Sequence, residues 1–173
     1  MGFSIFSHHE SWTIAHGLLF GTLYLIAFAG GLDALWNLRP GILTEEGIRK
    51  SIKRVQLGLW TMAVASWLTV ITGTYVVYVW YRAKIPGSPR SRLLSEPATA
   101  FWHTFGMEWK EHLSWIVPIL TTAAAFIVSR YGQELVKNRV LHSVVLWFLL
   151  VSSAMAGIGA LLGAFINKVA PFI

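Results

Sequence analysis

The chain has 173 residues, of which 55% are hydrophobic and only 13% are charged, and its net charge is +6. A soluble domain carries about 25% charged residues, so this chain has too little polar surface for a water-soluble globule, and we expect an integral membrane protein. The absence of cysteine excludes disulfides, thiolate-bound metals, iron–sulfur clusters and covalently attached haem from this chain.

Four apolar stretches reach the length of about 20 residues that a membrane-spanning helix needs. They lie at about residues 12–36, 57–81, 113–129 and 141–166. All four are expected to be helices, because an open strand cannot satisfy its backbone in lipid. We therefore predict one all-α domain over residues 1–173, an integral membrane four-helix bundle. An even number of spans puts both termini on one side, called side A here; the opposite side is side B.

The first span carries His16, one helical turn beyond Trp12 and beside the small-residue pair Gly17 and Gly21. Small faces let helices approach closely, and they also leave room for a flat macrocycle. An ionisable side chain inside a membrane usually marks a function, so His16 is a candidate ligand for a cofactor.

The connection after the first span contains the basic, amphipathic stretch EEGIRKSIKR, which we expect to form a short interfacial helix on side B. The second span has no histidine. The long connection after it belongs to side A and carries basic residues.

The stretch FWHTFGMEWKEHLSW, residues 101–115, gathers polar side chains just before the third span. Its His112 is expected at the depth of His16, so that the two imidazoles ligate the iron of one haem b, with His103 as the substitute ligand. Basic side chains on side A would pair with the haem propionates. These side chains are Arg82, Lys84, Arg90, Arg92 and Lys110.

The same stretch permits a metal site at the membrane surface. Glu108, Glu111 and His112 share one face of a helix, and carboxylates with imidazole suit iron, manganese or zinc. The alternative is a solvated helix start, since acidic residues in a first turn interact favourably with the helix dipole. The histidines can likewise be hydrogen-bonded interfacial residues rather than ligands.

The third and fourth spans add two features. Pro118 is expected to kink the third span. The fourth contains Gly159 and Gly163, a second close-packing pair. His142 belongs to side B and cannot share an iron with His16.

Several segments carry a resemblance: HTFGMEWKEH at 103–112 with the following WIVP, GAFINK at 163–168, AHGLLFG and ITGTYVVYVWYRA. Together they resemble an uncharacterised family of small four-span bacterial membrane proteins, and the resemblance implies a fold but no activity. The architecture is also similar to the membrane b-type cytochrome subunits of respiratory enzymes, from which this chain departs in having no histidine in its second span.

These observations predict a non-catalytic membrane subunit that carries one haem b and passes electrons between a redox partner and quinone. The alternative is a haem-free structural or anchoring subunit. Expected partners are other subunits of a membrane complex, lipids and quinone, with no nucleic acid. Eight of the 14 basic residues fall on side B. The positive-inside rule then predicts a bacterial inner-membrane protein with periplasmic termini.

Overall fold

The protein is all-helical. The computed structural model describes residues 6–38 and 44–170, and it is 89% helical, with no strand in those residues. Four continuous helical segments are long and apolar enough to cross a membrane, namely His8–Trp36, Glu45–Tyr81, Pro97–Val136 and Arg139–Val169. The predicted four-helix fold is confirmed, and its apolar helices are those expected of a multi-pass membrane protein.

Each span is built from shorter elements. The first comprises α1 (His8–Ile14), the π-helical turn η1 (Ala15–Leu19) and α2 (Phe20–Trp36). The second comprises α3 (Glu45–Thr72), η2 (Gly73–Val77) and α4 (Tyr78–Tyr81). Helix α5 (Pro89–Ser95) precedes the third span, which comprises α6 (Pro97–Phe101), η3 (Trp102–Met107), α7 (Glu108–Leu113), α8 (Ile116–Tyr131) and the 3₁₀ turn η4 (Gly132–Val136). The fourth span is α9 (Arg139–Val169).

One local expectation needs correction. The stretch EEGIRKSIKR is not a separate interfacial helix but the first turns of α3, because Thr44 caps that helix by accepting a hydrogen bond from the Gly47 amide and no breaker follows. The third span departs from a regular α-helix at Ser114 and Trp115, between α7 and α8. Because Pro118 has no N–H for the carbonyl of Ser114, four residues earlier, this is where a proline is expected to disturb the helix.

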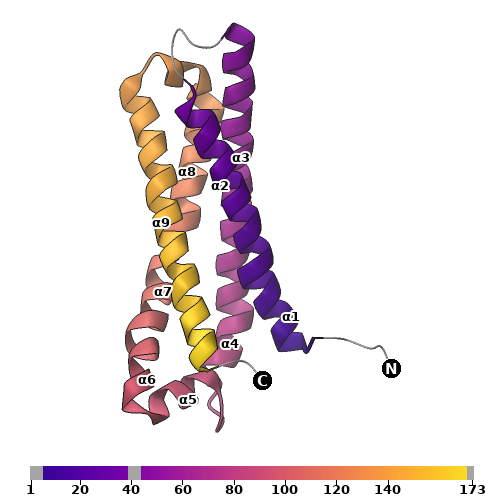
Figure 1. Ribbon diagram of the computed structural model, residues 1–173, viewed down its shortest axis with the longest axis vertical. Helices are drawn as coiled ribbons and strands as arrows, with labels where there is room; N and C mark the ends of the chain where they lie inside the picture. The colour runs from indigo at the N-terminus through magenta and orange to yellow at the C-terminus, as the bar shows by residue number, and fades with distance from the viewer. Residues whose placement is uncertain (1–5, 39–43, 171–173) are drawn as a thin grey trace, which may run out of the picture.

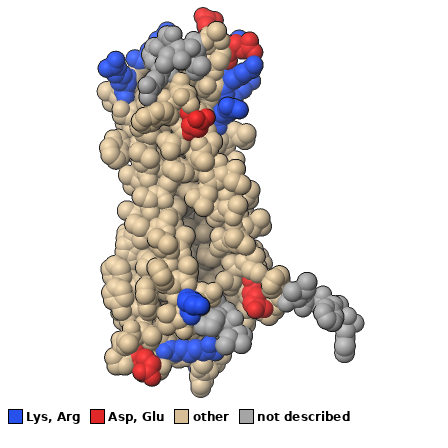
Figure 2. Space-filling model, viewed as in Figure 1, with Lys and Arg blue, Asp and Glu red and all other residues tan. Residues whose placement is uncertain are grey.

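The spans form a bundle whose two ends differ. Helix α1 begins and α9 ends at the lower end in Figure 1, which is side A and also holds α5 and α6. The start of α3 and the connection to α9 lie at the upper end, side B. In Figure 2 the charged side chains on the visible face gather at these two ends and leave an uncharged belt between them, as a membrane requires.

The main apolar core lies between side B and mid-height. Leu35, Val55, Leu59, Ala124 and Leu149 are completely buried there. Between 17% and 33% of the apolar window of each span is buried within the chain, so most of the remaining apolar surface is left for lipid or partner helices.

Candidate functional site

All three π-helical turns of the described chain, η1, η2 and η3, lie in the side A half of the bundle. Single π turns are rare in helices and are frequently found at functional sites. His16 lies in η1, Thr72 directly precedes η2, and His103 lies in η3. Side A is therefore the candidate region for a functional site.

His16, on η1, packs against the second span. Its Nδ1 lies 3.3 Å from the Thr72 hydroxyl. A Cβ atom added to Gly73 would come within 2.7 Å of the His16 ring carbon Cε1, so the ring lies directly on the backbone of η2. The imidazole is partly buried, and the absence of a side chain at position 73 makes its position possible.

Lys110, on α7, extends from the third span toward the fourth. Its Nζ would lie 2.6 Å from a Cβ added to Gly163 of α9. It is also the charged group that acts electrostatically on the His16 imidazole. Among the residues that the structure describes, none forms a hydrogen bond or ion pair with this ammonium.

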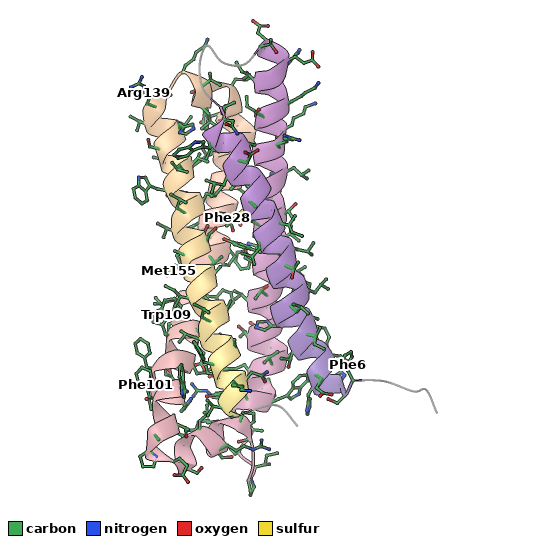
Figure 3. The ribbon with its side chains drawn as sticks, in the orientation of Figure 1. Phe6, Phe28, Phe101, Trp109, Arg139 and Met155 are labelled. Atoms are coloured by element: carbon green, nitrogen blue, oxygen red, sulfur yellow. The ribbon has the colours of Figure 1, made fainter. Side chains whose placement is uncertain are left out.

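The first and fourth spans diverge toward side A. Nearer side B the two spans are in contact, since the Tyr24 hydroxyl donates to Ser152 at 3.2 Å and a Cβ added to Gly31 would lie 3.9 Å from Leu149. Toward side A, Figure 1 shows α1 leaning away from the end of α9, and neither Gly17 nor Gly21 would bring an added Cβ within 4 Å of another residue. Figure 3 shows Phe28 and Met155 near mid-height.

We call the region between the diverging ends of the first and fourth spans the A groove. It is defined by small residues of these two spans together with the two polar side chains described above. The residues are Gly17 and Gly21 of the first span, Ala156, Ala160 and Gly163 of α9, and His16 and Lys110. Ala160 is exposed although it lies two turns beyond the buried Ser152 on the same helix face, as expected if the fourth span has no neighbour there.

A second polar cluster joins the ends of the second and third spans. The Arg82 Nη2 atom donates to Glu108 at 2.5 Å and to Glu111 at 2.8 Å, while the Tyr78 hydroxyl donates to Glu111 at 3.2 Å. Partial burial lowers the pKa of Arg82, but the hydrogen bonds and opposite charge of Glu111 outweigh it and hold that pKa above its ordinary value. This cluster joins the ends of the second and third spans through ion pairs.

His103, on η3, is buried and engaged through both ring nitrogens. Its Nδ1 lies 2.9 Å from the Tyr81 hydroxyl, and its Nε2 accepts from the Arg90 Nε at 3.3 Å. The ring therefore ties α5 to the second and third spans. Arg90 is engaged in the same contact, and Arg92 lies partly buried on α5.

His112 lies on the exposed surface of α7, where its Nδ1 donates to the carbonyl of Glu108 at 2.7 Å. Glu108 and Glu111 turn toward Arg82. In the described part of the chain, no three histidine, aspartate or glutamate side chains lie close enough to hold a metal ion. The surface metal site therefore has no supporting geometry.

The expected haem b needs two imidazole ligands for its iron and basic side chains for its propionates. His16 suits an axial ligand, because a hydrogen bond to its Nδ1 leaves Nε2 for iron. The second ligand is missing, since His112 is exposed on its own helix and both nitrogens of His103 are used. Arg82, which was expected to pair with a haem propionate, instead forms ion pairs with two carboxylates. The described residues do not fit a haem with two histidine ligands from this chain.

Sequence reasoning singled out His16 and Lys110 but not Thr72 and Gly73, which contact His16. The signal for that pair was the TG dipeptide at the side A end of an apolar span, which alone is too common to be informative. The π turns that align these residues leave no recognisable pattern in the sequence.

Comparison with known proteins gives no relative: no protein-family model, curated protein or solved structure matches the chain. The function must therefore be argued from the site.

Proposed function

We propose that this chain is the membrane subunit of an electron-transfer complex and that its A groove binds the head group of a quinone-type carrier. The observation that carries the proposal is the position of Lys110, whose ammonium lies against Gly163 of α9 and forms no hydrogen bond or ion pair with another residue that the structure describes. A lysine inside a membrane span is costly without a partner, so a ligand oxygen is the natural complement to its ammonium.

The depth and shape of the groove restrict the ligand. His16 lies eight residues beyond the start of α1, which corresponds to about 12 Å along the helix, deeper than a lipid headgroup at the helix end. The first and fourth spans diverge on side A, and we propose that a flat, lipid-soluble molecule enters between them from the bilayer. Quinones combine an apolar tail and ring with two oxygen atoms that hydrogen-bond, and binding sites of this kind are apolar with a few placed polar groups.

Haem b is not part of this proposal, because the described residues supply one suitable imidazole rather than two. The electron donor or acceptor would belong to another subunit of the complex. This chain would contribute binding, orientation and an apolar environment.

Titration of the purified protein in lipid nanodiscs with short-chain ubiquinone and menaquinone analogues, followed by quenching of tryptophan fluorescence, tests the proposal. We expect saturable binding that Lys110→Met weakens about tenfold or more, through loss of a charged hydrogen bond. Lys168→Met, which removes an exposed lysine at the end of α9, is the matched control and should leave binding unchanged. Absence of saturable binding, or equal affinity in both variants, would contradict the proposal.

A second candidate is the haem-free anchoring subunit. It is favoured by Gly17, Gly30 and Gly157, at each of which an added Cβ would have open space around it, because such faces can receive partner helices. Under this candidate the titration shows no binding, and the wild-type protein instead co-purifies with another membrane protein from its native membrane.

For localisation we propose a bacterial inner membrane with side B in the cytoplasm. Support comes from the excess of basic residues on side B, eight of 14. Side A, with the A groove, the start of α1 and the end of α9, would then face the periplasm.

A further inference from the structure

The contacts of His103 require a neutral imidazole with its proton on one particular nitrogen. Its Nε2 accepts a hydrogen bond from the Arg90 Nε at 3.3 Å. A guanidinium group has donors and no acceptor, so this Nε2 must carry a lone pair. The proton of the ring is therefore on Nδ1, which donates to the Tyr81 hydroxyl at 2.9 Å. We call the contact from Arg90 through His103 to Tyr81 the α5 clasp, because it joins α5 to the second and third spans.

Helix α5 is a separate short helix that these contacts hold against the side A end of the bundle (Figure 1). An extended residue, Glu96, separates it from α6. Its Leu93 is completely buried in a small apolar cluster with Tyr81, and the Leu93 carbonyl accepts from the Thr99 hydroxyl at 2.9 Å. Among the residues that the structure describes, Arg90 forms no ion pair and no second hydrogen bond. The α5 clasp is therefore the one of these contacts that depends on the protonation of a histidine.

A second proton on His103 is incompatible with the α5 clasp. That proton would occupy Nε2 and point at the Nε–H of Arg90, so two donors and two positive charges would meet with no acceptor between them. Three further charged groups act on the ring electrostatically, namely Arg82, Glu108 and Glu111. Arg82 forms ion pairs with both glutamates, which partly neutralises the negative charge that they present to the ring. The direct contact with Arg90 remains uncompensated.

We infer that the α5 clasp opens in acid: protonation of His103 releases Arg90 and lets α5 move away from the ends of the spans. This inference does not depend on quinone binding. A solvated imidazole titrates near pH 6.5. The open form takes up a proton there and the closed form does not, so the closed form is fully stabilised above about pH 6.5 and loses stability as the pH falls below it. Between pH 7.5 and pH 5.0 the open population should rise by up to about thirtyfold.

Amide hydrogen exchange of the protein in nanodiscs, corrected for the intrinsic exchange rate at each pH, tests the inference. The protection factor of residues 91–95 should fall about tenfold to thirtyfold between pH 7.5 and pH 5.0, whereas that of residues 55–62 in the buried core should stay constant. His103→Gln keeps an acceptor for Arg90 and a donor for Tyr81 but does not titrate, so its α5 should be equally protected at both pH values. Unchanged protection of α5 in the wild-type protein, or the same loss in His103→Gln, overturns the inference.

A labelling experiment that leaves His103 in place covers the case in which His103→Gln does not fold. The chain has no cysteine of its own, Leu93 is completely buried, and Leu94 on the same helix is 40% exposed. The rate at which a water-soluble methanethiosulfonate labels Leu93→Cys, divided by the rate for Leu94→Cys, cancels the effect of pH on the reagent. This ratio should rise about tenfold or more between pH 7.5 and pH 5.0. Adding Arg90→Met should make the ratio high at both pH values, and a ratio that acid leaves constant in the presence of Arg90 would contradict the inference.

Discussion

At the scale of single residues, Arg82 illustrates how the side A end is held together. Its guanidinium bridges two carboxylates from the third span, and its carbon Cζ lies 5.0 Å from the centre of the Tyr78 ring. The side chains of Arg82 and Glu111 are 31% and 17% exposed, whereas those of the surface pair Lys50 and Glu46 are 75% and 67% exposed. The two ion pairs therefore differ in how strongly water screens them.

Replacing Arg82 by glutamine should lower the free energy of unfolding by about 1–3 kcal/mol, because two partly buried carboxylates lose their donor and face each other. Lys50→Gln removes a solvated pair and should change the free energy by about 0.5 kcal/mol or less. Unfolding in mixed micelles with increasing SDS, followed by circular dichroism, measures both values. Equal effects in the two variants would show that Arg82 does not stabilise the contact between the second and third spans.

Contacts between single residues of different spans could not be predicted from the sequence. Helical spacing correctly placed Glu108 and Glu111 on one face, but it could not show that Arg82, from another span, occupies that face. His103 and His112 looked equivalent in the sequence. Tertiary contacts separate them, since one is buried between Tyr81 and Arg90 and the other is exposed.

At the scale of helices, α2 and α3 pack with their backbones in close contact. A Cβ added to Gly58 would lie 3.0 Å from the Ala27 carbonyl and 3.1 Å from the Gly31 Cα. Backbone contact of this kind needs glycine, as in other membrane helix pairs. Gly30, the neighbour of Gly31, faces open space.

Gly58→Leu should therefore separate α2 from α3 and cost about 1–3 kcal/mol of unfolding free energy through overpacking. Gly30→Leu adds the same side chain to the outward face of α2 and should leave the free energy unchanged or slightly raised. The same SDS titration measures both. A neutral Gly58→Leu variant would mean that the two backbones do not pack as described.

The helices themselves were largely predictable, because length and hydropathy dominate in a bilayer. The expected spans near 12–36 and 141–166 fall within His8–Trp36 and Arg139–Val169. The helical extension before the third span was missed, since its polar residues resemble a loop. The three π turns were also missed, because they depend on contacts between spans rather than on local sequence.

At the scale of the whole molecule, the cysteine-free sequence allows the proposed orientation to be tested directly. Ile85, between α4 and α5, is exposed on side A, and Gln133, in η4, is exposed on side B. In spheroplasts a membrane-impermeant maleimide should label Ile85→Cys but not Gln133→Cys, and permeabilisation should make both reactive. The reverse pattern would place side B outside and contradict the charge argument.

The central claim is that a quinone-type carrier binds in the A groove, and photolabelling with an azido-quinone analogue followed by peptide mass spectrometry tests it most directly. The account predicts labels in the groove walls, within residues 12–24 and 153–167, that disappear when excess unlabelled quinone is added. A shallow apolar depression between α2 and α3, lined by residues including Leu23, Trp60 and Leu68, is a competing location. Labels confined to Trp60 and Leu68, or labels that unlabelled quinone does not displace, would contradict the claim.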